Sequence, residues 1–165
     1  MPRSLTERCE GILVSEGADE RLLAHCRAVR ETAREWEDSP LVQAELLEAG
    51  ALLHDIGRTR THTMAHAEEG ADLCRSLGLS EEIARIAERH IGAGLTPDEC
   101  CLYGLLPRDC MPETLEERIV ANADNLVEGA EETSVYRLLE GAFALKRRYR
   151  KRMYRLYLEM EQFKE

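Results

Sequence analysis

Residues 40–58, PLVQAELLEAGALLHDIGR, hold the pattern that decides the fold. Pro40 is placed to open a helix, and apolar residues then recur at spacings of three and four, the period of one helix face. The expected inner face consists of Val42, Leu46, Ala49 and Leu53. Because His54 and Asp55 come directly after this face, two polar side chains are expected at the edge of a core.

The helical period runs through nearly the whole chain, and no alternating stretch is long enough to predict a strand. Gly17 and Gly78 are placed to end helices, and Asp19, Ser80 and Thr114 to cap them. Further helices are expected over residues 5–16, 19–36, 65–77, 80–91, 114–128 and 134–163, with a polar connection at 56–64 and a long irregular loop at 95–113. We therefore expect an all-α fold, a single helical-bundle domain over residues 1–165 with about six or seven helices and its core at about 20–130.

The composition excludes several classes of protein. The 165 residues are 44% hydrophobic and 33% charged, which is typical of a globular domain. The net charge of −10 argues against broad nonspecific attraction to nucleic acid or anionic membranes. No apolar run is long enough to span a membrane, and the start MPRSLTERCE lacks the pattern of a secretory signal. A cytoplasmic protein that does not engage a membrane is therefore expected.

The cysteines indicate no chemistry of their own. They number six, and they form neither a CxxC pair nor a zinc spacing. Without an export signal, reduced thiols that pack as small hydrophobic side chains are expected.

Polar side chains interrupt the apolar faces of several predicted helices. His25, His90 and Asp124 each share a face with apolar residues, and His54 and Asp55 follow the apolar end of their helix. One buried histidine is usually an ordinary hydrogen-bonded core residue, but a buried carboxylate without a partner is costly. A divalent cation would neutralise the carboxylates and orient the rings, and inward-facing ligands in a helical bundle commonly build such a site.

This ordered set resembles the metal signature of the HD-domain metal-dependent phosphohydrolase superfamily, in its HDIG-type form. The similar segments, in chain order, are His25, HDIGR at 54–58, HAxxGA at 66–71, His90 and ADNL at 123–126. The resemblance covers most of the chain, and it implies a helical phosphohydrolase domain.

The resemblance also implies the metal ligands. A first ion would be held by His25, His54, Asp55 and Asp124. Asp55 would bridge to a second ion, held in addition by His66 and His90. His62 is an alternative to His66, but we expect it at the surface. The implied cofactor is one or two divalent transition-metal ions, Mn, Fe, Ni, Co or Zn, with Mg as a further alternative.

An ion with open coordination positions supplies hydroxide near neutral pH and neutralises charge on a phosphoryl group. The expected reaction is hydrolysis of a phosphomonoester, phosphodiester or phosphoanhydride of a nucleotide or similar small phosphate compound by metal-activated water. Asp55 and Arg58 are the expected catalytic residues, and Arg58 and Arg89 the expected substrate-binding ones, because a guanidinium holds phosphate through paired hydrogen bonds. For Arg58, a solvated loop arginine is an equal alternative, and Arg89 is the weaker candidate.

The last predicted helix, residues 134–163, is amphipathic and carries the basic run KRRYRKRMYR at 146–155. Its apolar stripe is expected to dock onto the domain or to pair with a second copy in a homo-oligomer, and its basic face to be solvated. The alternative to an enzyme is a non-catalytic HD scaffold that binds RNA or an acidic partner through this helix. A small phosphorylated substrate, a nucleotide above all, is the favoured partner, and nucleic acid is less favoured.

Overall fold

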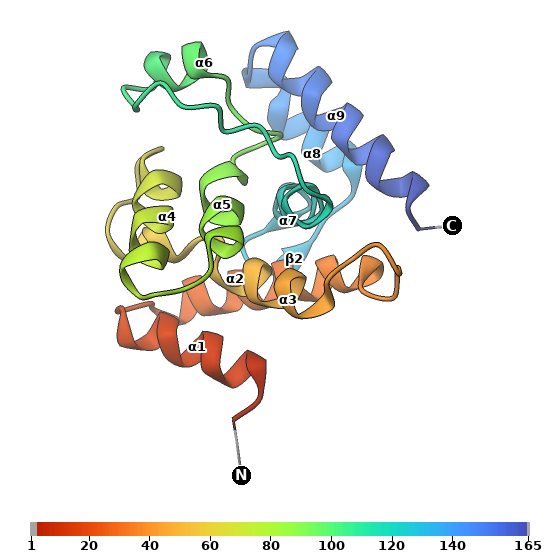
Figure 1. Cartoon of the computed structure of the whole chain (residues 1–165). Coiled ribbons are helices and arrows are strands. Elements are labelled where there is room, and N and C mark those ends of the chain that lie inside the picture. The colour runs from red at the N-terminus through yellow and green to blue at the C-terminus, as the bar shows by residue number, and fades with distance from the viewer. Residues whose placement is uncertain (1–2, 165) are drawn as a thin grey trace.

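The computed structural model describes residues 3–164, and helices dominate it (Figure 1). Its α-helices are α1 (Leu5–Ser15), α2 (Glu20–Ala33), α3 (Ala44–Leu53), α4 (His66–Ser76), α5 (Glu81–Arg89), α6 (Pro97–Leu102), α7 (Leu115–Asn125), α8 (Val135–Gly141) and α9 (Arg147–Gln162). Three short 3-10 turns are η1 (Arg34–Trp36), η2 (Ile56–Thr59) and η3 (Ala142–Ala144). The strands of the described part are β1 (Val127–Glu128) and β2 (Glu131–Glu132), which form a small antiparallel hairpin. The predicted all-α class is therefore confirmed.

The core has two parts, and α2 and α3 contribute to both. One part lies among α1 to α5 and includes the fully buried Leu13 and Leu52. The other gathers around α7, at the centre of Figure 1, and includes Trp36, Ile119 and Met160. The indole Nε1 of Trp36 donates to the carbonyl oxygen of Met160 at 2.9 Å. This bond ties the C-terminal helix α9 to η1, the turn that follows α2.

Side-chain caps begin the helices where the sequence predicts them. The Asp19 carboxylate accepts a hydrogen bond from the third backbone N–H of its helix at 2.8 Å, and the hydroxyls of Ser80 and Thr114 do the same for α5 and α7. Glu117 completes a capping box with Thr114. The cap residues themselves lie in extended backbone, so each cap also fixes the direction from which the chain enters its helix.

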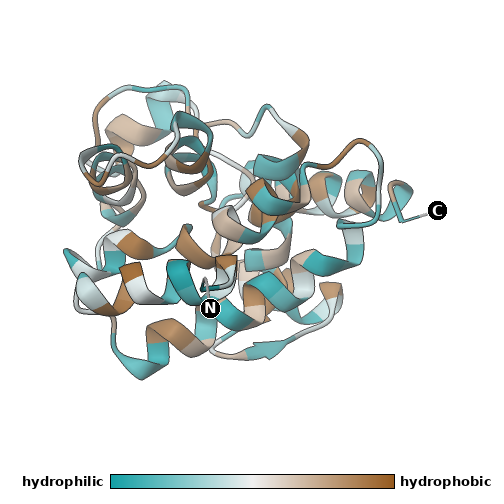
Figure 2. Cartoon of the chain, turned by 60° about the horizontal axis from the view of Figure 1, so that its bottom comes forward, coloured by the Kyte–Doolittle hydropathy of each residue, from teal (hydrophilic) through white to brown (hydrophobic). Residues whose placement is uncertain are grey.

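Hydropathy follows the packing of these helices. Figure 2 shows hydrophilic and hydrophobic positions side by side on the same helices, as expected for elements with one buried face. The described residues contain no helix that is both long and apolar enough to cross a membrane. All of the cysteines are free thiols, and Cys9, Cys26, Cys74 and Cys100 are buried among apolar side chains.

Three predicted helix boundaries are wrong. Helix α3 begins at Ala44 rather than at Pro40, because the preceding Gln43 is extended and its N–H donates to the Glu116 carboxylate of α7 at 2.8 Å. Helix α2 ends at Ala33, and the chain tightens into η1 up to Trp36. Helix α7 ends at Asn125 instead of near residue 128, because the chain turns there into the β1–β2 hairpin.

The C-terminal third also departs from prediction. The long loop at 95–113 contains α6, which begins with a capping box between Thr96 and Glu99. The single helix expected over 134–163 is broken, because Leu145 and Lys146 are extended between η3 and α9. The break lets α9 pack on α7 with Met153, Leu156 and Met160 buried, whereas Leu145 remains 42% exposed.

Candidate metal centre

Four histidines and two aspartates, carried by helices α2 to α5 and α7 or by the residues directly after them, converge in one cluster. Their ligand atoms form overlapping groups of three, and within each group all atoms lie within 4.8 Å of one another. The six residues are His25 on α2, His54 and Asp55 after α3, His66 at the start of α4, His90 after α5 and Asp124 on α7. The structure therefore brings together every residue that the sequence predicts as a metal ligand.

A close contact between two glycines holds the His54–Asp55 turn against α4. A Cβ atom on Gly57 would lie 1.8 Å from the carbonyl oxygen of His66 and 2.6 Å from the backbone nitrogen of Gly70. Only a residue without a side chain fits there, so the turn η2 can approach the first turn of α4. This approach carries Asp55 to His66, and it explains why glycine stands at both positions.

Each imidazole is oriented by a backbone carbonyl. The Nδ1 atoms of His25, His54, His66 and His90 lie 2.7 Å from the carbonyl oxygens of Gly129, Ala51, Thr63 and Ala87, respectively. Because a carbonyl can only accept, Nδ1 of each ring donates its proton, and in the neutral ring the lone pair is on Nε2. All the Nε2 atoms face the aspartates. Metal-binding histidines are held in the same way.

His25, His54 and Asp124 form one side of the cluster. Oδ1 of Asp124 lies 3.0 Å from Nε2 of His25 and 3.4 Å from Nε2 of His54. Burial alone would raise the pKa of Asp124, but the two imidazoles outweigh it and hold this pKa well below its ordinary value. Burial lowers the pKa of each histidine, but the Asp124 carboxylate outweighs that effect and raises both.

His66 and His90 form the other side. Their Nε2 atoms lie 3.2 and 3.5 Å from Oδ1 of Asp55, whereas Oδ2 of Asp55 lies 3.9 Å from Nε2 of His25. Burial opposes charge on Asp55, but the neighbouring imidazoles lower its pKa below the ordinary value. Burial and the charge of His90 lower the pKa of His66 to about 4, so this ring is neutral at pH 7. The two oxygens of Asp55 thus face two different histidine groups.

Two contacts in the cluster fit a cation better than hydrogen bonding alone. Nε2 of His54 is fully buried and has no hydrogen-bond partner. The Nε2 atoms of His66 and His90 are 3.1 Å apart, although Nδ1 of each ring already donates a proton. Two lone pairs therefore face each other in the neutral rings, which is unfavourable without a cation or a proton between them. The nitrogen and oxygen donors fit a divalent transition metal.

A cleft of about 980 Å³ borders the cluster. His25, Asp55 and Asp124 line this cleft, together with Arg58 of η2. Nε of Arg58 lies 3.1 Å from Oδ2 of Asp55, and its Nη1 donates to the backbone carbonyl of His62 at 3.3 Å. Arg58 is therefore held against the cluster by its contact with Asp55. The alternative, an arginine that extends from the loop into solvent, does not describe this position.

The structure places two other sequence candidates outside the cluster. The side chain of His62 is exposed in the cleft, as expected of a surface histidine. Arg89 is not among the residues that line the cleft. Its Nη1 lies 3.0 Å from the Glu117 carboxylate and 3.2 Å from that of Glu113, so its guanidinium is committed to α7 and the loop before it.

Two features of the site were not predicted from the sequence. The carbonyl of Gly129 orients His25, and it comes from the turn of the unpredicted hairpin. Arg21 lines the cleft one helical turn before His25. The spacing of four residues on α2 is a signal that points to Arg21 once His25 is assigned. No comparable signal points to Gly129, because it lies 104 positions from its partner.

Comparison with known proteins agrees with this geometry. Residues 22–128 match the HD domain family. An uncharacterised protein of Methanocaldococcus jannaschii is 48% identical over 121 residues, which cover 70% of this chain and 72% of that protein. Two tRNA (cytidine(56)-2'-O)-methyltransferases, from Picrophilus torridus and Thermoplasma volcanium, are 46% and 43% identical over 121 residues. Those matches cover 73% of this chain but only 36% of each methyltransferase.

Two solved structures of the HD domain of the L. monocytogenes phosphodiesterase PgpH share the fold at 16% identity. One, in complex with cyclic-di-AMP, has a TM-score of 0.55 over 85% of this chain and 89% of that one. The other has a TM-score of 0.57 over 98% of both chains. With the match over residues 22–128, these comparisons show that the chain belongs to the HD-domain family.

Proposed function

We propose that this protein is a metal-dependent phosphohydrolase. The observation that carries the proposal is the orientation of the four imidazoles, whose Nδ1 atoms are all bound to backbone carbonyls and whose Nε2 atoms all face Asp55 and Asp124. A non-catalytic scaffold has no need to keep such a complete set of donors in register. The donor set therefore favours an enzyme.

In this proposal, His25, His54 and Asp124 would hold a first divalent ion, and His66 and His90 would hold a second. Asp55, which faces both groups of histidines, would be a ligand of each. A bound ion would supply hydroxide near neutral pH and neutralise charge on a phosphoryl group. The chain's own part is to fix the orientation of each imidazole, with Nδ1 bound to a backbone carbonyl and Nε2 facing the aspartates.

Arg58 is the proposed contact to the substrate phosphate. It lies in the cleft beside Asp55, and its remaining N–H donors are available to an anion once its Nε and Nη1 contacts are counted. A guanidinium in that position binds a phosphoryl oxygen next to the ligands of the ion and stabilises its growing charge. Arg89 has no part in this proposal, because its carboxylate partners already neutralise it.

The proposed substrate is a nucleotide or a similar small phosphate compound. The cleft volume of about 980 Å³ is at the upper end of the range for small-molecule sites. The complex of the PgpH domain with cyclic-di-AMP and the names of the two methyltransferase relatives support a substrate with nucleotide chemistry. Both monoesters and diesters are compatible with the proposed ion pair and Arg58.

The test is the release of phosphate or of nucleotide products from a panel of mono-, cyclic and dinucleotides by the purified protein loaded with Mn²⁺, Fe²⁺, Co²⁺ or Ni²⁺. Asp55→Asn keeps the size of the side chain and removes its charge. Loss of a group that only supports a metal ligand lowers activity about 10- to 100-fold, so we expect the loss of a proposed ligand to lower it by more than about 100-fold. The matched control is Asp72→Asn on α4, whose carboxylate is exposed and forms an ion pair with Arg75. Folded, metal-loaded protein that hydrolyses no member of the panel would overturn the proposal.

A further inference from the structure

The cations of this protein fall into two groups that differ in their surroundings. Fourteen of the 22 lysines and arginines make an ion pair with a carboxylate. Of the eight that make none among the described residues, five lie in the run 146–155: Lys146, Arg147, Arg150, Lys151 and Arg155. With 32 acidic residues in the chain, unpaired cations would be expected to be few and scattered, but most of them fall in this one run.

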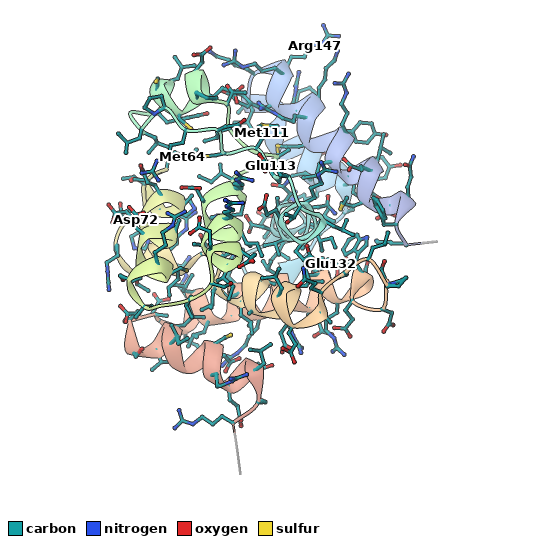
Figure 3. The ribbon with its side chains drawn as sticks, in the orientation of Figure 1. Met64, Asp72, Met111, Glu113, Glu132 and Arg147 are labelled. Atoms are coloured by element: carbon teal, nitrogen blue, oxygen red, sulfur yellow. The ribbon has the colours of Figure 1, made fainter. Side chains whose placement is uncertain are left out.

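Helix α9 arranges part of this charge as a stripe. Arg147, Lys151 and Arg155 are four residues apart, so they lie on one face and are spaced by about 6 Å along the axis. All three are exposed, and Arg147 projects away from the body of the molecule in Figure 3. Tyr154 lies on the same face, is 42% exposed, and stacks on Tyr157 with ring centroids 6.4 Å apart. We name Arg147, Lys151, Tyr154 and Arg155 the α9 stripe.

The opposite face of α9 shows that the stripe is not a membrane anchor. Met153, Leu156 and Met160 are buried in the core, and Met160 is also held through its carbonyl by Trp36. A helix that binds a lipid surface needs a broad free apolar face, whereas α9 packs its main apolar face on the domain and leaves Leu158, 44% exposed, as a single aliphatic side chain beside the stripe. What α9 offers to a partner is a rigid row of cations with an aromatic ring among them.

We propose that the α9 stripe binds single-stranded nucleic acid. Regularly spaced cations match the repeated charge of a phosphate backbone, and an exposed tyrosine provides a stacking surface for a base. Helix α9 contributes none of the residues that line the cleft, so this surface is separate from the proposed hydrolase site. The inference therefore does not depend on the proposed activity.

The test is fluorescence anisotropy of a labelled 20-nucleotide RNA, of DNA with the same sequence, and of polyphosphate, titrated with the full chain between 50 and 200 mM salt. We expect both strands to bind with a Kd of about 1–100 µM. The triple variant R147Q/K151Q/R155Q is expected to flatten the slope of log K against log salt by about 2, which is the contribution of three neutralised phosphates on a single strand. Tyr154→Ala is expected to weaken strand binding roughly 5- to 100-fold and Tyr154→Phe much less, because stacking needs the ring.

The matched control is R34Q/R85Q/R137Q, which removes the same charge from exposed arginines that are ion-paired elsewhere. This control should leave strand binding within about twofold, as should Asp55→Asn, because neither changes the stripe. Equal loss in the two triple variants would overturn the proposal, since it would show only a response to net charge. The proposal also fails if neither RNA nor DNA binds at 50 mM salt, a result that would instead suit a surface for an acidic protein. It fails as well if polyphosphate binds as tightly as RNA and Tyr154→Ala leaves RNA binding unchanged.

Discussion

Asp55 is the residue on which the two halves of the cluster meet. One of its oxygens faces His25, and the other faces His66 and His90. Its position depends on Gly57, two residues later, which lets the turn touch the backbone of α4. The contact explains in steric terms why an aspartate at a helix end is followed so closely by a glycine.

Gly57→Ala is therefore expected to destabilise the protein strongly. The new methyl group would sit 1.8 Å from a backbone oxygen, so the turn must move away from α4, at a cost of about 3 kcal/mol or more. Urea unfolding of both proteins measures this difference. Gly141→Ala is the control, because no atom lies within 4 Å of its Cβ position, and it should change stability by less than about 1 kcal/mol. Equal effects of the two substitutions would contradict the steric account.

Arg58→Ala is expected to raise KM for a phosphorylated substrate about 10- to 100-fold, which corresponds to the loss of one or two charged hydrogen bonds. Metal content should stay unchanged, because Arg58 is no ligand. Steady-state kinetics and elemental analysis provide the two readouts. Arg60→Ala, in the same turn but paired with Glu16, should leave KM unchanged. An Arg58→Ala enzyme with wild-type KM would remove Arg58 from substrate binding.

Single residues of the cluster were predictable where local sequence determines them. His54 and Asp55 adjoin an apolar helix, and the helical period places Asp124 on a buried face. The role of Arg89 was not predictable, because its partners Glu113 and Glu117 follow it by more than twenty residues and only the packing of α5 beside α7 joins them. The same holds for the carbonyl of Gly129.

At the scale of elements, the short helix α6 holds α9 in place. Glu99, almost fully buried, completes the cap of α6 and lies 2.7 Å from Nη2 of Arg152 and 3.1 Å from Nε of Arg148. Burial opposes its charge, but the Arg152 guanidinium outweighs burial and lowers the pKa of Glu99 below the ordinary value of 4.5. A buried carboxylate thus links the loop at 95–113 to the C-terminal helix.

Glu99→Gln is expected to lower the free energy of unfolding by about 2 kcal/mol at pH 7, as for the loss of a hydrogen-bonded charge. Because the folded-state pKa is depressed, the stabilisation is present above pH 4.5 and is lost as the pH falls through the folded-state pKa. The difference between the two proteins should therefore shrink toward pH 3, measured by urea unfolding at each pH. Glu159→Gln, which breaks a half-exposed pair between Glu159 of α9 and Arg118 of α7, should cost less than about 1 kcal/mol. A Glu99→Gln difference that is constant with pH would contradict this account.

Helix starts follow from local caps, so the sequence predicts them well, whereas other boundaries depend on tertiary contacts. The cap residues Asp19, Ser80 and Thr114 mark their helices correctly. Neither glycine nor proline stands at Leu145 and Lys146, where the last helix breaks, so the break follows from the docking of α9 on α7. Helix α6 has a recognisable cap at Thr96 and Pro97, and the high proline content of the surrounding loop concealed it.

For the whole molecule, the cluster joins five helices from both parts of the core. An ion bound there would cross-link segments from residue 25 to residue 124, and it would stabilise only the folded state. Divalent metal at 100 times its Kd is expected to add about 2.7 kcal/mol, or roughly 5–10 °C in Tm for a domain of this size. Chelation should reverse the shift. His54→Ala should abolish the rise in Tm on addition of metal, whereas substitution of the exposed His62 should preserve it. A Tm that no divalent metal changes would contradict the account.

The most direct measurement of the central claim is anomalous X-ray diffraction from crystals grown with Mn²⁺ or Ni²⁺. We expect an anomalous peak within coordination distance of Nε2 of His25 and His54 and of carboxylate oxygens of Asp55 and Asp124. Any second peak should lie between Asp55, His66 and His90. Rings that turn Nε2 away from the aspartates, or metal peaks confined to other parts of the surface, would contradict it.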